Sequence, residues 1–106
     1  MKIKNFFYEE ADGIHFPDAF AGSEEVYQID FSRFLKEEGA YLDDTLWEVD
    51  AGLKLMKNYI CPDAAHTACV EIGTPFPGSF NLRCLARIVK GSQHERIVVP
   101  MVIRVY

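Results

Sequence analysis

Three cysteines and a histidine are the residues of this chain whose types best suit a metal ion. They follow one another as C-x4-H-x2-C-x14-C, at Cys61, His66, Cys69 and Cys84. Zinc takes thiolate and imidazole ligands, but a structural site needs four of them to converge. Alternation along the expected strands places Cys84 on an inner face and Cys69 on an outer one. We therefore expect no metal site and no cofactor, with Cys84 as a small core residue.

Two pairs of acidic residues are the candidates for general acid–base catalysis. Glu48 and Asp50 lie two residues apart on an expected strand and share a face, but that face should meet water. A catalytic carboxylate needs a pKa shifted by burial or by a close partner, and neither is indicated. Asp43 and Asp44 more simply make a turn. No serine stands in a G-x-S-x-G motif and no phosphate-binding glycine motif is present, so we predict that the chain is not an enzyme.

Length, charge and cysteine content restrict the remaining classes. The chain has 106 residues, enough for one domain, and a formal net charge of −5, which argues against nucleic-acid binding. Its first 53 residues hold 4 Lys and Arg against 13 Asp and Glu, whereas the rest holds 7 against 3, which favours attraction to a charged neighbour or another copy. An odd number of cysteines, no signal peptide and no long apolar run predict a protein that folds in a cytoplasm and has no membrane partner.

Short runs of alternating apolar and polar residues predict the elements that would hold any site. The expected strands are Val26–Phe31, Thr45–Asp50, a short one around Leu53–Met56, Thr67–Ile72, Phe80–Val89 and Ile97–Val105. A helical turn is expected over Ser32–Gly39 and a loop over Gly73–Gly78. This pattern predicts an all-β fold, an immunoglobulin-like antiparallel β-sandwich of about seven short strands. The sandwich would span residues 25–106, and an irregular N-terminal arm or loop segment would span residues 1–24.

The hairpin formed by the last two expected strands carries an unusual outer face. Antiparallel sheets with one wet face normally have polar residues there. This face instead holds five apolar residues, which we predict to be a partner interface: Leu85, Val89, Val98, Val102 and Tyr106. Arg83 and Arg87 lie on the same face and are placed to bind a partner's carboxylates.

The first 24 residues contain several aromatic side chains without clean periodicity. Phe6, Phe7, Phe16 and Phe20 stand among acidic and small residues. Leaving so many aromatic side chains in water would be costly. The segment either folds back over its own core or extends as an arm whose aromatics dock on another subunit, and both readings stay open.

The order of the strand sequences resembles a known family. The segments that carry the resemblance are V-Y-Q-I-D-F-S-R-F-L (Val26–Leu35), T-L-W-E-V-D-A-G-L (Thr45–Leu53), T-A-C-V-E-I-G (Thr67–Gly73), G-S-F-N-L-R-C-L-A-R-I-V (Gly78–Val89) and E-R-I-V-V-P-M-V-I-R-V (Glu95–Val105). They resemble small tailed-bacteriophage virion proteins with an immunoglobulin-like sandwich, the phage fiber–tail adaptor proteins. The resemblance implies a non-enzymatic structural protein, assembled in the bacterial host cytoplasm into the virion. Its partners would be other tail, neck or fiber subunits and further copies of itself.

Two further hypotheses come from other functional classes. The first is a carbohydrate- or peptide-binding β-sandwich module, for which Phe76, between two prolines, is the obvious exposed aromatic residue outside the arm. The second is a small enzyme or metalloprotein, which neither the cysteine spacing nor the solvated carboxylates favour.

Overall fold

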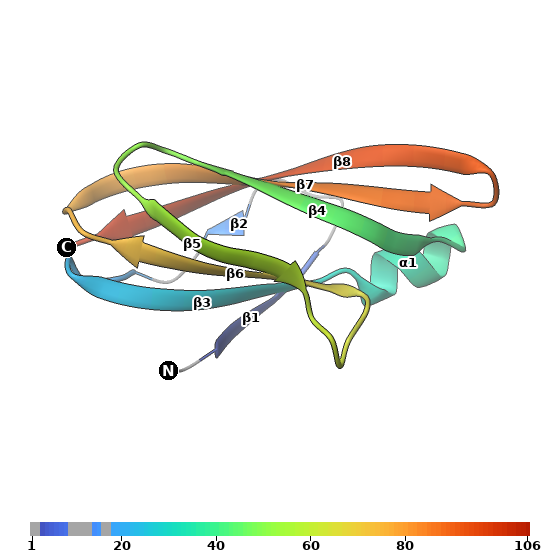
Figure 1. Ribbon diagram of the computed structural model, residues 1–106, viewed down its shortest axis with the longest axis horizontal. Coiled ribbons are helices and arrows are strands. Elements are labelled where there is room, and N and C mark those ends of the chain that lie inside the picture. Colours follow the sequence, from blue (N-terminus) through green and yellow to red (C-terminus); the bar gives the residue numbers. More distant parts are fainter. Residues whose placement is uncertain (1–2, 9–13, 16–17) are drawn as a thin grey trace.

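Two four-stranded β-sheets packed face to face make up the computed structural model, which describes residues 3–8, 14–15 and 18–106 (Figure 1). The first sheet has the strand order β1-β3-β6-β5 and the second β2-β8-β7-β4. The elements are β1 (Ile3–Phe7), β2 (Ile14–His15), β3 (Ser23–Asp30), α1 (Ser32–Glu38), β4 (Tyr41–Val49), β5 (Lys54–Ile60), β6 (Thr67–Thr74), β7 (Gly78–Lys90) and β8 (Gln93–Val105). The predicted immunoglobulin-like β-sandwich is confirmed.

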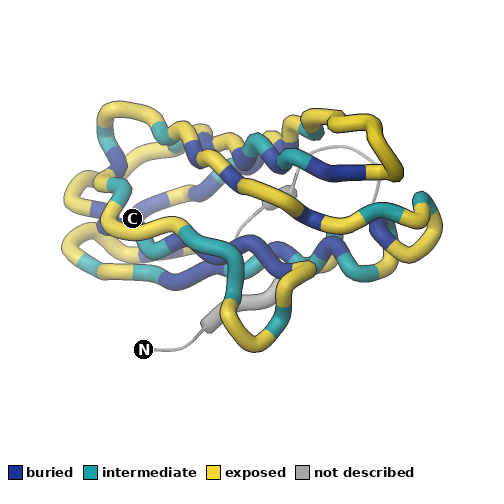
Figure 2. Tube along the Cα trace, turned by 45° about the vertical axis from the view of Figure 1, so that its right-hand side comes forward, coloured by how far each residue is buried: buried dark blue, intermediate teal, exposed yellow. Residues whose placement is uncertain are grey.

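The core lies between the two sheets and is built from the alternating inward residues of the long strands (Figure 2). Side chains that are fully or almost fully buried come from both layers: Tyr27, Ile29, Val70 and Ile72 from the first sheet, and Leu82, Cys84, Ala86, Met101 and Ile103 from the second. The two inner faces are apolar because their residues recur with the period of two that a pleated strand imposes.

Most expected strands are found, with some longer than the pattern predicted. β5 continues to Ile60, past the expected end at Met56, and is paired with β6. β7 and β8 form the predicted hairpin, joined by Gly91, whose φ of 61° suits a glycine at the turn.

The N-terminal segment lies on its own sandwich wherever the structure describes it. β1 pairs in parallel with β3, and β2 pairs in parallel with β8 opposite Met101. The ring of Phe6 lies 6.2 Å from that of Tyr27, and the ring of Tyr8 lies 5.0 Å from that of Phe31. At these residues the segment therefore adds to its own core. Phe16 falls outside the described residues.

The connection from β3 to β4 contains the predicted helical turn, α1. Asp30 Oδ1 accepts a hydrogen bond from the Ser32 N–H at 2.7 Å, and Leu35 is the buried residue of the helix. Gly39 ends it with a φ of 62°, a left-handed conformation that costs a glycine little. No helix in the described part of the chain is long and apolar enough to cross a membrane.

The inward and outward faces of one strand pair allow a direct test of the core. Leu82 is 1% exposed on the inner face, whereas Leu46 is 51% exposed on the outer face of the neighbouring strand. We expect Leu82→Ala to lower the free energy of unfolding by about 2–5 kcal/mol, because it leaves a cavity. The matched variant Leu46→Ala should cost less than about 1 kcal/mol. Urea denaturation followed by the fluorescence of Trp47 measures both, and equal losses would contradict this assignment of faces.

Candidate binding surfaces

The outer face of the β7–β8 hairpin is less apolar than the sequence suggested. Val98 and Tyr106 are exposed, while Leu85 and Val102 are half-buried. Val89 is 4% exposed and thus belongs to the buried residues, so its place in a solvent-facing patch was wrong. The next residue, Lys90, forms an ion pair with Glu38 in which Nζ lies 3.2 Å from Oε2. This ion pair links α1 to the end of β7.

The two arginines of this face are already engaged within the same sheet. Arg83 pairs with Glu48, its register partner on β4, and Arg87 pairs with Asp43 through Nε at 2.7 Å. Within the described residues β4 thus already supplies a carboxylate to each guanidinium group, and their binding to a partner's carboxylates stays a prediction. Such exposed ion pairs contribute little to stability, but they place paired charges on the outer face of the second sheet.

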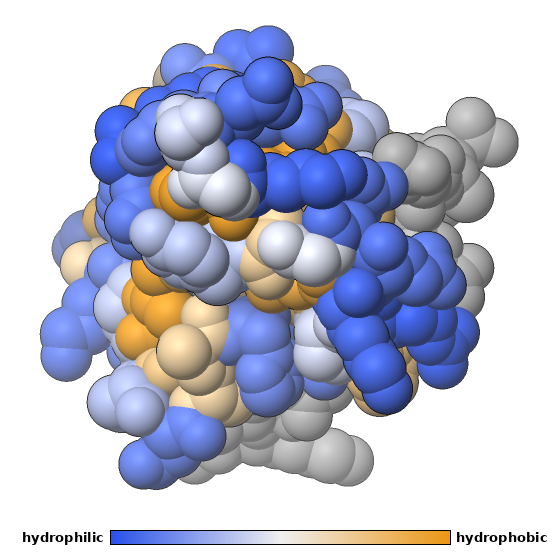
Figure 3. Space-filling model, turned by 90° about the vertical axis from the view of Figure 1, so that its right-hand side faces the viewer, coloured by the Kyte–Doolittle hydropathy of each residue, from blue (hydrophilic) through white to orange (hydrophobic). Residues whose placement is uncertain are grey.

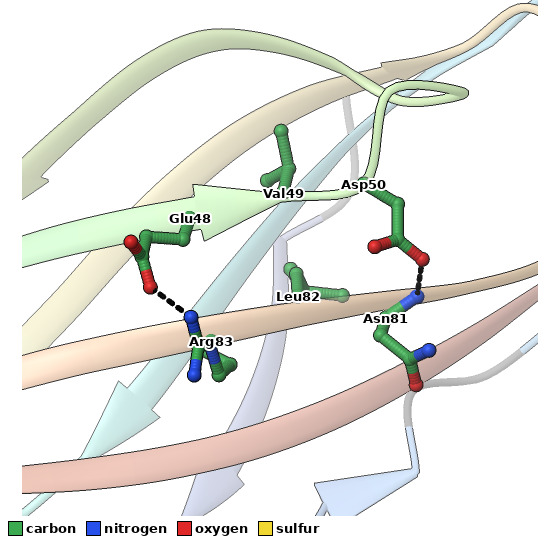
Figure 4. Close-up of a pocket in the computed structure, with 6 residues that line it drawn as sticks. All are labelled: Glu48, Val49, Asp50, Asn81, Leu82 and Arg83. Atoms are coloured by element: carbon green, nitrogen blue, oxygen red, sulfur yellow. Dashed lines mark hydrogen bonds and ion pairs between the residues drawn. The ribbon is translucent and has the colours of Figure 1, made fainter.

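A hollow of about 300 Å³ lies beside one of these ion pairs (Figure 4). It is lined by Glu48, Val49, Asp50, Asn81, Leu82 and Arg83. Asp50 Oδ2 accepts a hydrogen bond from the Asn81 N–H at 2.7 Å, and Glu48 pairs with Arg83. Both carboxylates thus hold strands together.

One end of the sandwich gathers α1, the 61–66 turn and the β7–β8 turn, and we call it the helical end (Figure 1). Hydrophilic side chains cover much of it, with smaller apolar areas between them (Figure 3). Arg33, Lys36 and Glu37 of α1 are exposed. A hollow of about 230 Å³ there is lined by Ser32, Leu35, Ala40, Tyr41, Leu42, Ala65 and His66. Tyr41, on the rim, is 60% exposed.

The opposite end presents three exposed aromatic side chains, and we call it the aromatic end. Phe20 is 72% exposed, Phe76 61% and Tyr106 52%. They come from the segment before β3, from the 75–77 connection between β6 and β7, and from the residue after β8, which lie at one end of the molecule (Figure 1). The Arg104 guanidinium lies 5.4 Å from the centre of the Tyr106 ring, within cation–π range.

A buried threonine ties these three segments together. Thr74 is fully buried, and its hydroxyl donates to the Phe20 carbonyl at 3.0 Å, with the Ser23 carbonyl at 3.2 Å as the second acceptor. The Thr74 carbonyl accepts from the Gly22 N–H at 2.7 Å. On the other side of the Phe20 segment, the Ala21 N–H donates to the Tyr106 carbonyl at 2.7 Å. The Phe20 segment is thus held between β6 and the last residue of the chain.

The sequence alone pointed to the separate aromatic residues of this end but did not group them. Phe20 and Tyr106 were assigned to a subunit interface and Phe76 to ligand binding. Their grouping depends on backbone hydrogen bonds between segments more than 50 residues apart, for which no local pattern exists. A glycine and a serine after Phe20 were the one local sign of a turn.

The cysteines do not form a metal centre in the part of the chain that the structure describes. Cys84 lies in the core as expected, but Cys69, expected on an outer face, is also fully buried. Burial raises the pKa of the Cys84 thiol to about 12 and, together with the neighbouring Cys61 thiol, raises that of Cys69 to about 11. Both are therefore neutral thiols at physiological pH.

Comparison with known proteins gives structural matches alone. No family model and no curated protein matches the sequence. The cysteine protease inhibitor EhICP2 from Entamoeba histolytica matches with a TM-score of 0.59 and 9% identity, covering 98% of this chain and 95% of that one. The solution structure of amebosin matches with a TM-score of 0.53 and 10% identity over the whole of both chains.

The chain therefore shares the immunoglobulin-like β-sandwich fold of these two structures. Identities this low show a shared fold and no more. Because both structures align over nearly the full length of this chain, the fold they share spans the whole domain.

The prediction that this chain is related to phage fiber–tail adaptor proteins is wrong. Two structures that share the fold over nearly the whole chain are a cysteine protease inhibitor and amebosin. The predicted structural role in a virion is therefore also wrong. So is the prediction of its partners, which were to be tail, neck or fiber subunits and further copies of the chain. The sequence segments behind that resemblance follow from strand alternation, which any sandwich shares. The prediction of a non-enzymatic protein agrees with the comparison, since EhICP2 is described as an inhibitor of enzymes.

Removing the Thr74 hydroxyl should loosen the aromatic end. Thr74→Val keeps the side-chain volume but removes the hydroxyl that bonds the Phe20 carbonyl and lies 3.0 Å from the Ser23 hydroxyl, so we expect the free energy of unfolding to fall by about 0.5–1.5 kcal/mol. Thr45→Val, at another buried threonine that takes no part in this network, should cost less than about 0.5 kcal/mol. Urea denaturation measures both, and faster amide exchange at Gly22 would locate the effect. A stable Thr74→Val protein with unchanged exchange would contradict the anchoring role.

The raised thiol pKa values predict how the cysteines react. At pH 8 the thiolate fraction should be on the order of 10⁻⁴ for Cys84 and 10⁻³ for Cys69, and burial also blocks access. Alkylation of the native protein, mapped by mass spectrometry, should therefore label Cys61 first, because it is partly exposed. All three should react in urea, since unfolding returns the pKa values to ordinary ones. Rapid labelling of Cys84 in the native protein would be inconsistent with its place in the core.

Proposed function

We propose that this protein is a protein inhibitor that binds cysteine proteases. The observation that carries the proposal is the match to EhICP2, a cysteine protease inhibitor, over 98% of this chain and 95% of that one. Because coverage is nearly complete on both sides, the two proteins share one whole domain rather than a common supersecondary motif.

The geometry of the described residues suits such a role. An inhibitor that blocks a cleft needs a rigid body and a surface that fits, and no catalytic group of its own. The paired sheets provide the rigid body, and the connections at the two ends include many exposed residues (Figure 2). A preorganised surface binds with little loss of conformational entropy, which is where rigid inhibitors gain affinity.

The proposal lies closer to the peptide-binding hypothesis than to the virion role. In both cases the sandwich recognises a polypeptide partner by packing and hydrogen bonds. Carbohydrate binding has less support, because it needs a concave site with exposed aromatic side chains. The exposed aromatics Phe20, Phe76 and Tyr106 line neither the hollow beside Arg83 nor the one at the helical end.

Titration of papain with the purified protein tests the proposal. We expect stoichiometric loss of peptide hydrolysis with an inhibition constant below about 1 μM, since protease–inhibitor pairs of ordinary interface size bind at least this tightly. Trypsin, a serine protease, is the control and should keep its full activity.

Two further measurements separate inhibition from competition by a poor substrate. Mass spectrometry after incubation should show an intact chain, and papain alkylated at its catalytic cysteine should still form a complex of one copy each by light scattering. Hydrolysis that is unaffected at about 100 μM protein, for papain and for other cysteine proteases, would overturn the proposal.

A further inference from the structure

We propose that Cys61 and Cys69 are joined by a reversible disulfide when the chain meets an oxidant, and that this bond tightens the 61–66 turn. The inference goes beyond the proposed function and does not depend on it. It is carried by the strand register that places both thiols on one face of a sheet, by their unequal exposure and by the hydrogen bonds of the turn.

The ladder between β5 and β6 brings the two cysteines to one face of the first sheet. Tyr59 is the register partner of Cys69, and the Cys61 N–H donates to the Thr67 carbonyl at 2.9 Å, so the pairing continues past the end of β5. Residues opposite each other on antiparallel strands point to the same side, as do residues two apart on one strand. Cys61 and Cys69 are therefore diagonal neighbours on the outer face, whereas Ala68 points into the core.

The distance between the two thiols suits a bond that forms with a small movement. Burial raises the pKa of the Cys69 thiol to about 11, and the Cys61 thiol adds to this rise, which requires the two sulfur atoms to lie near each other. Diagonal neighbours are about 7–8 Å apart at Cα, and disulfides usually join Cα atoms about 4.4–6.8 Å apart. Cys61 is followed by the turn that begins with Pro62, so a shift of roughly 1 Å toward β6 disturbs little of the ladder.

The unequal exposure of the two cysteines fixes the order of the reaction. Cys61 is partly exposed, whereas Cys69 is fully buried. With glutathione disulfide as the oxidant, the Cys61 thiolate attacks one of its sulfur atoms and displaces one glutathione thiolate. The Cys69 thiolate then attacks the Cys61 sulfur and displaces the second. Each leaving thiolate takes up the proton that one cysteine gave up, so two protein thiols are oxidised while one glutathione disulfide is reduced to two glutathione molecules.

Hydrogen bonds carry a movement of Cys61 into the turn and on to α1. The Ala64 N–H donates to the Cys61 carbonyl at 3.1 Å, and the Thr67 N–H donates to the Ala64 carbonyl at 2.9 Å. The His66 carbonyl accepts from the Phe31 N–H, the residue before α1, at 2.9 Å. The disulfide therefore changes the surface that the turn and α1 form together. Its diagonal geometry strains the bond and makes it easy to reduce, so the change is reversible.

Incubation with glutathione disulfide, followed by peptide mapping, tests the proposal. After free thiols are blocked in urea, trypsin and an endoprotease that cuts before Asp63 release residues 58–62 and 63–83, which contain Cys61 and Cys69, separately from the peptide of Cys84. We expect the first two peptides to be joined, the Cys84 peptide to carry a blocked thiol, and reduced glutathione to restore all three thiols. A wild-type protein whose Cys61 stays free, links two chains or keeps glutathione beside a free Cys69 would overturn the proposal.

Three variants separate this pairing from general thiol oxidation. In Cys69→Ala, Cys61 should keep a bound glutathione, because no second thiol displaces it. Cys84→Ala is the matched control, since both residues are fully buried cysteines, and it should still give the joined peptides. Cys61→Ser changes a partly exposed residue, so it should keep the wild-type melting temperature, and its Cys69 should stay free. Oxidation of Cys69 in Cys61→Ser would contradict the proposed order of reaction.

Amide exchange compares the oxidised and reduced wild-type proteins. The Ala64 and Thr67 amides should exchange about 3-fold more slowly or less in the oxidised protein, because a cross-link restricts local opening of the turn. The Gly91 amide, in the β7–β8 turn, should keep its rate. Joined peptides with unchanged exchange at Ala64 and Thr67 would overturn the effect on the turn. None of these measurements involves a protease, so their failure leaves the proposed function standing.

Discussion

The burial of two apolar sheet faces against each other is the constraint on which the rest of this structure depends. Each of the fully buried aliphatic or aromatic side chains, such as Ile72 and Ile103, contributes about 1.5–3 kcal/mol relative to an exposed position. The faces can meet because side chains alternate along each strand, so every residue that points inward obliges its neighbours to point outward. The packing of the core therefore determines which residues of the strands face the solvent.

On the outer face of the second sheet, charged side chains pair with each other across neighbouring strands. Basic residues of β7 face acidic residues of β4 at or near matching register, so that Arg83 meets Glu48 and Arg87 meets Asp43. Between these pairs, Leu46, Leu85 and Val98 lie side by side across three strands. The apolar row is narrow and bordered by satisfied charges, which explains why a face that seemed apolar in the sequence is not a large patch.

The aromatic end owes its form to one buried hydroxyl and a few backbone hydrogen bonds. Because Thr74 and Tyr106 bind opposite sides of the segment that contains Phe20, three distant parts of the chain form a single rigid surface. A substitution in any one of these segments should therefore affect the conformation of the other two.

Much of the architecture was determined by the sequence itself, and the rest only by the tertiary structure. The strand alternation, the turns at Gly39 and Gly91 and the proline-flanked connection around Phe76 are local features, and local features depend on backbone sterics and on the period of two. They led to the sandwich, whereas the expectation that the chain is not an enzyme came from the missing catalytic motifs.

Only the tertiary structure decided which surfaces are available. Val89 and Cys69 stand at positions that alternation assigns to an outer face, yet both are buried. The pairing of both arginines with β4 and the meeting of Phe20, Phe76 and Tyr106 at one end are also contacts between residues far apart in the chain. Such contacts depend on strand order and register, which no local pattern of residues encodes.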